Sequence, residues 1–233
     1  MQSTENPFSH PDLTLSAALL SSHFASDYAR SRHPLRNPHP ETPVSAAVAA
    51  DAIPSAVLML FAPQDGELNL IVTRRSTKIR FGGHICFPGG KVDDSDANIE
   101  ATALREAQEE IGLDPAAVQV LGQLGDYVTQ SGYRISPVVA LAQQPLSIEH
   151  DLQPEPDEVA AIYALAASRV FTSDAYRLQH FGSHGHYAFH GEPGGDNIRI
   201  AGPTVSIMMG LYEEVLKSQG LLATAKQPQE VRL

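Results

Sequence analysis

Short apolar runs, each bounded by turn-forming residues, fill most of the chain after Pro54 and constrain its fold more than any other feature. Runs of this length are typical of strands. We expect strands at residues 56–62, 68–73, 85–87, 118–128, 135–142 and 159–165. Helical spacing appears in residues 97–111 and 203–218, and Gly112 and Gly220 follow these stretches as C-terminal stops. The core is therefore predicted to be α/β, in the broad sense that includes α+β folds.

The residues before position 51 do not follow this pattern. Residues 13–32 have the spacing of a weakly amphipathic helix. A series of prolines then breaks any regular structure: Pro34, Pro38, Pro40 and Pro43. After Gly220 the chain is polar. We expect a partly helical N-terminal extension at 1–50, one main domain at 51–220 and a C-terminal tail at 221–233.

The charge balance limits the classes of partner. The chain carries 27 acidic and 16 basic residues, a formal net charge of −11, which would repel the phosphate backbone of a nucleic acid. A single cysteine excludes an internal disulfide and suits a reducing compartment. No apolar run reaches the ~20 residues of a spanning helix, and no secretory signal is recognisable at the start. We expect a soluble cytoplasmic protein that binds neither nucleic acid nor membrane.

The predicted helix at 97–111 carries the residues that point to chemistry. On a wheel of about 100° per residue, three glutamates share one face and three apolar residues the other: Glu106, Glu109 and Glu110 against Leu104, Ala107 and Ile111. Only Arg105 lies nearby to offset these like charges. One interpretation is a solvated helix face. The other is a site for a divalent cation such as Mg²⁺, which prefers carboxylate oxygens.

The segment before this helix favours the metal site. Phe87-Pro-Gly-Gly90 follows a predicted strand and leads into an acidic loop that contains Asp93, Asp94 and Asp96. Paired glycines allow a tight turn and a close approach of a ligand to the backbone. The loop is not a P-loop, because no Gly-Lys-Ser/Thr follows at the required spacing.

Together these residues resemble the signature of the Nudix hydrolases. The matching positions are Gly90, Arg105-Glu106, Glu109-Glu110 and Gly112-Leu113. One position departs from the signature, because Ala97 stands eight residues before Arg105, where the family usually has a glutamate. The resemblance implies a Nudix-type αβα sandwich with a mixed sheet, so that 51–220 would be a Nudix hydrolase domain.

A longer match resembles the coenzyme A pyrophosphatase branch of this family, in which the pattern before the arginine is normally altered. It comprises Thr73-Arg-Arg-Ser-Thr-Lys-Ile-Arg80, Gly83, Phe87-Pro-Gly-Gly-Lys91, Asp93, Asp96 and Ala103-Leu-Arg-Glu-Ala107. The match is dense over residues 70–113 and looser to about Lys217. The branch usually has a tryptophan before the last helix, where this chain reads Ile200-Ala-Gly-Pro-Thr204.

Four basic residues lie within this match: Arg74, Arg75, Lys78 and Arg80. They could form a positive loop that balances the acidic face. They could also bind phosphate, because arginine recognises phosphate through paired hydrogen bonds and coenzyme A carries a 3′-phosphate beside its diphosphate. In a chain of charge −11 we favour the anionic ligand and predict that these residues bind substrate.

The resemblance implies cleavage of coenzyme A, or its derivatives, to 3′,5′-ADP and 4′-phosphopantetheine. Mg²⁺ or Mn²⁺ would be held by Glu106 and Glu110, with Glu109 assisting directly or through water, and Gly90 belongs to the predicted metal site. Arg105 would orient a glutamate through a salt bridge. Glu158 is the candidate for the base that takes a proton from water, and Glu155 and Asp157 are next in line. We count Glu109, Glu158 and Arg105 as the catalytic candidates.

Other interpretations stay open. The same chemistry could act on ADP-ribose, a dinucleotide or a nucleoside triphosphate, or the chain could be a non-catalytic binding protein of the same fold. A zinc site is less well supported, because glycines interleave its candidate ligands His180, His184, His186 and His190, for which a turn between strands is the better interpretation. Cys86 is expected to be a buried structural thiol. The expected partner is a small molecule, and a homodimer is left open.

Overall fold

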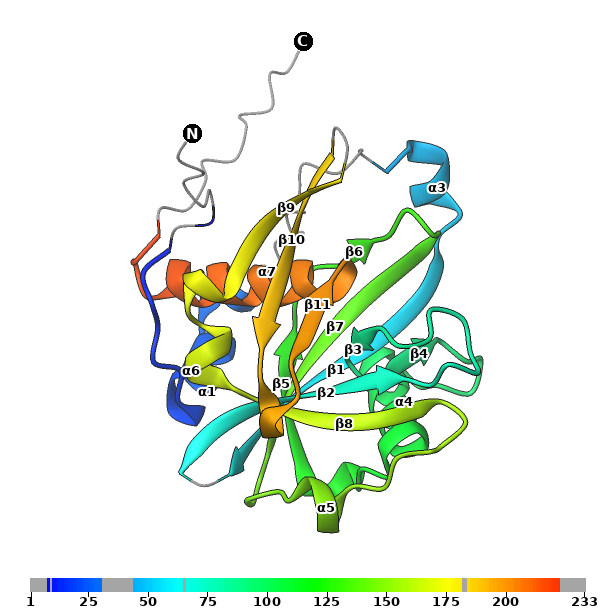
Figure 1. Cartoon of the computed structure of the whole chain (residues 1–233), viewed down its shortest axis with the longest axis horizontal. Coiled ribbons are helices and arrows are strands. Elements are labelled where there is room, and N and C mark those ends of the chain that lie inside the picture. Colours follow the sequence, from blue (N-terminus) through cyan, green and yellow to red (C-terminus); the bar gives the residue numbers. More distant parts are fainter. Residues whose placement is uncertain (1–7, 9, 31–43, 65, 182–183, 223–233) are drawn as a thin grey trace.

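The structure, a computed structural model, describes residues 8, 10–30, 44–64, 66–181 and 184–222. Within these residues the strands form a mixed eight-stranded sheet and a smaller antiparallel sheet of three strands (Figure 1). The strands are β1 Ile53–Gln64, β2 Glu67–Arg75, β3 Ile85–Cys86, β4 Gly89–Lys91, β5 Val118–Gln123, β6 Tyr127–Val128, β7 Tyr133–Ala142, β8 Val159–Ala166, β9 Tyr176–Phe181, β10 His184–Gly191 and β11 Ile198–Ala201. The helices are α1 Ala17–Ala25, α2 Asp27–Arg30, α3 Ala46–Ala50, α4 Ile99–Ile111, α5 Ile148–Asp151, α6 Ala167–Val170 and α7 Pro203–Ser218.

Strand β1 organises the larger sheet. It pairs in parallel with β7 from Ile53 to Phe61, and antiparallel with both β4 and β2, β4 near its start and β2 near its end. The main order is β3-β2-β1-β7-β5, and β8 pairs with β2. This pairing places β4, with its glycines, beside the middle of the sheet.

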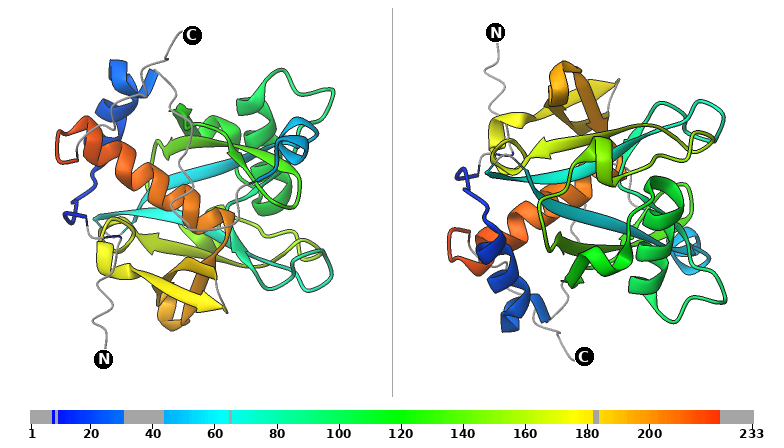
Figure 2. Two further views of the ribbon diagram at one scale, coloured as in Figure 1. Left: turned by 90° about the horizontal axis from the view of Figure 1, so that it is seen from above. Right: turned by 90° about the horizontal axis from the view of Figure 1, so that it is seen from below.

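The alternation of side chains along β1 divides the interior into two cores. Leu58 and Leu60 belong to the core that contains Ala103, Ala107 and Ile111 of α4. Met59 and Phe61 face the core that contains the buried residues of α7. Successive residues of a strand point to opposite faces, so α4 and α7 cover opposite faces of the sheet. Figure 2 shows the two helices separated in this way, which is the predicted αβα sandwich with a mixed sheet.

Most predicted elements are present. The last helix spans Pro203–Ser218 as expected, and its residues Ile207, Met208, Leu211 and Val215 are buried in the core. Gly112 and Gly220 adopt left-handed φ values of 66° and 69° after their helices, which glycine does with little steric cost. The helix predicted at 97–111 begins at Ile99, because Asn98 caps it by accepting a hydrogen bond from the backbone N–H of Ala101.

Two predictions of single elements were wrong. The strand predicted at 118–128 is interrupted after Gln123, and β5 and β6 are separate strands. Within β5, the pairing with β7 also shifts register between Val120 and Gly122. The helix predicted at 13–32 is divided into α1 and α2 at Ser26, whose hydroxyl and N–H both donate to the carbonyl of His23. Its last residues and the proline-rich stretch lie outside the described residues, as do 223–233 of the predicted tail.

Residues of the predicted extension contribute side chains to the larger of the two cores. Phe8, Leu15, Leu20 and Phe24 are buried there with the residues of α7. The phenol of Tyr212 in α7 donates a hydrogen bond to the carbonyl of Pro11 at 2.7 Å. The division into 1–50, 51–220 and 221–233 stays a prediction, but residues on both sides of position 51 share one core. Among the described residues, no helix combines the length and apolar character needed to cross a membrane.

Candidate active site

Helix α4 brings the glutamates to the sheet, but they do not share one face opposite the apolar residues as predicted. Glu110 is 3% exposed and is buried with Ala103, Ala107 and Ile111, because three residues at about 100° each place it only about 60° from Ala107. Glu106 is half-buried and Glu109 is exposed. The three carboxylates therefore have three different environments, and the interpretation of a uniformly solvated face was wrong.

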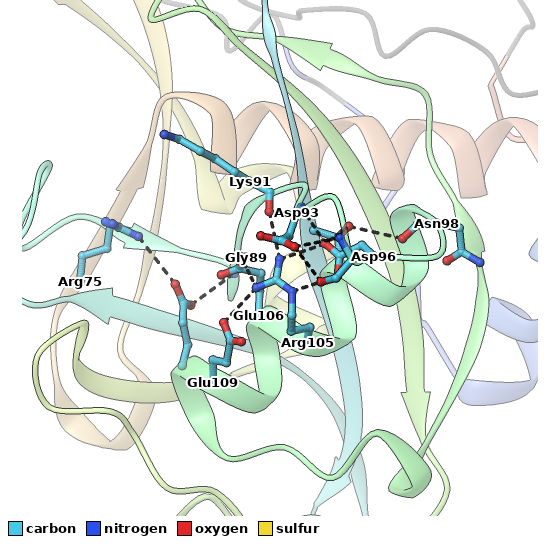
Figure 3. Close-up of polar contacts among 12 residues, drawn as sticks. Arg75, Gly89, Lys91, Asp93, Asp96, Asn98, Arg105, Glu106 and Glu109 are labelled. Atoms are coloured by element: carbon cyan, nitrogen blue, oxygen red, sulfur yellow. Dashed lines mark hydrogen bonds and ion pairs between the residues drawn. The ribbon is translucent and has the colours of Figure 1, made fainter.

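Glu110 lies between the sheet and the helix with few polar partners. Its Oε2 accepts a hydrogen bond of 3.3 Å from the backbone N–H of Gly89, and its Oε1 is 3.9 Å from the guanidinium of Arg75 (Figure 3). Burial raises the pKa of Glu110 to about 8, although the Gly89 N–H and the charge of Arg75 favour the ionised form. An additional positive charge beside this carboxylate would favour its ionisation.

Gly90 allows the second carboxylate to approach the backbone. A Cβ atom at this position would be 2.5 Å from the carboxyl carbon of Glu106, closer than real Cβ contacts allow. A side chain here would therefore displace Glu106. Burial also raises the pKa of Glu106, while its hydrogen bond and charge interaction with Arg105 act in the opposite direction.

Arg105 links the helix to the acidic loop before it. Its Nε and one terminal nitrogen donate to the two carboxylate oxygens of Asp96 at 2.9 and 3.0 Å, as Figure 3 shows. Its other terminal nitrogen is 2.8 Å from Glu106 and 2.9 Å from Glu109. The expected salt bridge from Arg105 to a glutamate is present with both residues. The hydrogen bonds from Arg105 hold the pKa of Asp96 well below its usual range.

Asp96 is the residue that sequence reasoning missed. It precedes Ala97 by one position, and its side chain is only 4% exposed. It also accepts hydrogen bonds from the Thr102 hydroxyl and from the backbone N–H of Asp93. The signal was the acidic loop itself, which carries Asp96 and leads directly into the helix that carries Arg105.

The loop before β8 brings further carboxylates to the site. Charge repulsion from Glu158 contributes to the raised pKa of both Glu106 and Glu110, after the larger effect of burial, which places the Glu158 carboxylate near them. Asp157 is engaged in an ion pair with Lys78 at 2.5 Å. The backbone N–H of Glu155 donates to the carbonyl of Glu110. Glu155, Asp157 and Glu158 are all exposed, and Glu158 is the one whose charge acts on both Glu106 and Glu110, so it stays the candidate for the base.

The four basic residues divide into two pairs. Arg75 and Arg80 line a cavity of about 900 Å³ beside Gly89 and Gly90. Arg74 points instead toward Tyr163 and Asp196, with its guanidinium 5.0 Å from the ring centroid and 3.9 Å from the carboxylate. Lys78 is paired with Asp157. Strand alternation explains why the neighbours Arg74 and Arg75 differ.

The remaining wall of the cavity comes from five other parts of the chain. The described lining residues are Ser55 and Val57 of β1, His84 to Phe87, Lys91, the 127–135 hairpin, and the start of α7 with Ala201, Gly202, Pro203, Thr204 and Ile207. The segment in which the tryptophan was missing thus forms part of this wall. A cavity of this size can hold a large organic ligand.

The histidines do not gather around a common point among the residues that the structure describes. His186 and His190 lie on β10, where their Nε2 atoms are 3.0 Å from Arg199 and 3.1 Å from Gln179. The side chains of His180 and His184, and the predicted turn at 182–183, lie outside the described part of the chain. Cys86 is half-buried and lines the cavity, so it is less buried than predicted. Desolvation raises the pKa of its thiol, whose Sγ is 3.5 Å from the Thr73 hydroxyl.

Comparison with known families identifies the family to which this arrangement of strands, glycines and glutamates belongs. The family described as "NUDIX domain" matches residues 52–191. The chain belongs to the NUDIX domain family. The match contains the whole of α4, the four basic residues and the loop that carries Glu158.

Curated relatives of this NUDIX domain include the "Uncharacterized Nudix hydrolase NudL" of Escherichia coli O1:K1 / APEC and that of Shigella boydii serotype 18. Each is 39% identical over 122 residues, which are 49% of this chain and 60% of the relative. The chain therefore spans about 60% of the length of these curated relatives.

Similar solved structures include the Nudix hydrolase RenU from M. smegmatis, with a TM-score of 0.47 and 17% identity over 76% of this chain and 91% of that one. The NUDIX domain of Shewanella oneidensis NrtR in complex with ADP ribose has a TM-score of 0.41 and 22% identity, over 51% of this chain and 75% of that one.

NUDIX enzymes generally use divalent ions such as Mg²⁺ or Mn²⁺. Among the described residues, no three acidic, histidine or cysteine side chains form a complete metal cage. Glu106 and Glu110 still fit such an ion, because Mg²⁺ is usually bound by one or two carboxylates together with waters and substrate phosphates. Glu109 is exposed and is ion-paired with Arg105 through its Oε2, as Glu106 is through its Oε1.

Proposed function

We propose that this chain is a metal-dependent hydrolase of the diphosphate bridge in coenzyme A or its derivatives, with 3′,5′-ADP and 4′-phosphopantetheine as products. The observation that carries this proposal is the position of the half-buried Glu106 and the buried Glu110 beside a cavity lined by Arg75 and Arg80. Carboxylates together with guanidinium groups suit a ligand with a metal-binding diphosphate and a further phosphate.

The residues have distinct roles in this reaction. Glu106 and Glu110 hold the divalent ion, which neutralises phosphoryl charge and orients water when it is bound. Arg105, fixed by Asp96, keeps Glu106 in place. Glu158 takes a proton from the attacking water, whose oxygen bonds to one phosphorus while the bond from that phosphorus to the bridging oxygen breaks.

The volume and charge of the cavity support a large anionic substrate. A cavity of about 900 Å³ can hold an extended ligand, and the lysine and arginines on its described wall, Arg75, Arg80 and Lys91, belong to the segment that resembles the coenzyme A branch. Arg80 makes no ion pair within the described residues, so its charge is available to a phosphate.

Turnover with Mg²⁺ or Mn²⁺ on coenzyme A, acetyl-coenzyme A, ADP-ribose and NADH tests the substrate class. We expect the coenzyme A compounds to be hydrolysed with the highest kcat/KM, with 3′,5′-ADP identified as product. Higher efficiency on ADP-ribose or NADH would replace coenzyme A with a general dinucleotide substrate. Absence of metal-dependent turnover on all four would favour a binding protein.

A substrate without the 3′-phosphate tests the arginines. For the wild type, we expect kcat/KM to fall roughly 10- to 150-fold on 3′-dephospho-coenzyme A, since a charge-assisted hydrogen bond contributes about 1.5–3 kcal/mol. In Arg75→Ala or Arg80→Ala, whichever removes the contact, this ratio should shrink toward one. Arg74→Ala and Lys78→Ala are the matched controls and should keep the wild-type ratio. Equal efficiency of the wild type on both substrates would contradict the coenzyme A proposal.

A further inference from the structure

Phe81 has an unusual backbone conformation for its residue type. Its φ is +62°, and within the described residues it is the one non-glycine residue with a positive φ. This region is unfavourable for a bulky side chain and is generally occupied where the surrounding structure imposes it. Its ring is also 47% exposed, so burial of the ring does not compensate the strain.

The loop around Phe81 is tightly built. The backbone N–H of Gly83 donates to the carbonyl of Arg75 at 2.9 Å, and that of Gly82 donates to Ile79 at 3.1 Å. A Cβ at Gly82 would be 2.6 Å from the Cα of Thr77, so the two backbone segments are in close contact. These contacts fix the direction in which Phe81 projects.

Phe81 projects at the wall of the proposed substrate cavity. It lines this cavity together with Arg75, Arg80 and Gly90. The guanidinium carbon of Arg80 lies 4.6 Å from the centroid of the Phe81 ring, within the range of a cation–π interaction. The aromatic face and the phosphate-binding charge are therefore held as one unit.

We propose that Phe81 is a stacking platform for the purine base of a nucleotide whose phosphates reach Arg80 and Arg75. The His84 ring also lies 6.0 Å from the Phe81 ring, and the base packs on the part that Arg80 and His84 leave exposed. Every base has a flat π-face, and stacking on an exposed aromatic side chain is a common means of holding it. This assignment rests on the proposed diphosphate hydrolase function and adds the group that selects the nucleotide end of the substrate.

Calorimetric titration of the full chain without metal tests the platform with AMP and ribose 5-phosphate as probes. A base stacked on an aromatic side chain contributes about 5- to 150-fold in affinity. Phe81→Ala should weaken AMP binding by a factor in this range and change ribose 5-phosphate binding less than about twofold. Phe81→Tyr should keep the affinity for AMP. Leu221→Ala, which removes an exposed apolar side chain outside the cavity, is the matched control.

Phe81→Gly separates the ligand role from a structural one. Glycine adopts a positive φ without strain, so this variant should unfold at a temperature at least as high as the wild type while losing affinity for AMP as Phe81→Ala does. A lower unfolding temperature, with equal losses for AMP and ribose 5-phosphate, would show that Phe81 only supports the loop. Unchanged AMP affinity in Phe81→Ala would also overturn the platform.

Parallel turnover measurements distinguish this inference from the proposed function. If the wild type hydrolyses coenzyme A but KM is unchanged in Phe81→Ala, the platform is wrong and the substrate stands. If the wild type binds AMP through Phe81 but does not hydrolyse coenzyme A, the platform stands and the substrate is wrong.

Discussion

Glu110 is held in a place that suits a charged group only when a cation is present. Its carboxyl has one backbone N–H donor and a distant guanidinium as partners, and burial raises its pKa to about 8. In the metal-free protein it therefore carries a proton at neutral pH. Binding of a divalent ion would have to release that proton.

We predict that the stability of the metal-free protein falls as the pH rises from about 4.5 to about 8. Over this range the unfolded chain ionises Glu110 while the folded chain keeps it protonated, so folding takes up a proton. The slope contributed by this group is at most about 1.4 kcal/mol per pH unit. Glu110→Gln should remove it, so that its unfolding temperature in chelator exceeds that of the wild type by a margin that increases with pH.

The same variant tests the metal site through activity. Glu110→Gln should lose most turnover at saturating Mg²⁺ with its fold unchanged, because the amide lacks the charge that a hard cation prefers. A wild-type rate would show that Glu110 does not bind the ion.

Asp96 determines the position of Arg105 and, through it, of Glu106. We expect Asp96→Asn to lower turnover about 10- to 100-fold, as is typical when the residue that orients a metal ligand is changed. The lower activity of this variant should appear as a smaller kcat and as a higher metal concentration for half-maximal activity. Asp94→Asn is the control, because Asp94 is an exposed neighbour outside the Arg105 network. Equal activities of the two variants would remove Asp96 from the site.

The contact between β4 and α4 depends on the absence of a side chain at Gly90. We predict that Gly90→Ala folds but loses most turnover, because the added Cβ would occupy the place of the Glu106 carboxylate. Gly66→Ala provides the contrast, since Gly66 has open space around it but a φ of +80°. That variant should keep its activity and lose about 1 kcal/mol or more of stability. The comparison is made by measuring the denaturant midpoint of unfolding and the turnover rate of both variants.

The elements with a clear apolar period were predictable from sequence. Strands β1, β2, β7 and β8 and helix α7 have enough apolar residues to specify their type and approximate bounds. Strand β4 was missed because Gly89 and Gly90 have no strand propensity, and its pairing is imposed by β1. The apolar run at 118–128 concealed the break between β5 and β6.

The site was predictable in its residue types and less so in their surroundings. The wheel could not show the surroundings of the glutamates, because they depend on another element: Gly90 leaves the space that the Glu106 carboxylate occupies, and Gly89 donates its N–H to Glu110. The salt bridge of Arg105 with a glutamate was predicted, whereas its paired hydrogen bonds with Asp96 of the loop before α4 were not. The four clustered basic residues were taken as one group, although ion pairs with Asp196 and Asp157 engage two of them.

At the scale of the whole molecule, the question is whether the N-terminal residues unfold together with the main domain. Phe8 is 3% exposed, with its ring centroid 5.1 Å from Tyr176 and 5.7 Å from Tyr212. We expect Phe8→Ala to lower the free energy of unfolding by about 3–5 kcal/mol in a single cooperative transition. Thr14→Ala, an exposed change on the same segment, should have little effect. A separate early transition in Phe8→Ala would instead identify 1–50 as an independent appendage.

The parallel pairing of β1 with β7 has a consequence for folding kinetics. Ile53 lies opposite Tyr133, so the central pairing requires closure of a long loop that contains β2, β4 and the whole of α4. Such non-local pairing lowers folding rates, because chain entropy is lost before the contacts form. The antiparallel contact of β4 with β1 crosses a shorter distance in sequence and can form earlier. Glu110 nevertheless needs the completed sheet to become buried, so we expect affinity for metal to appear only in the last phase of refolding.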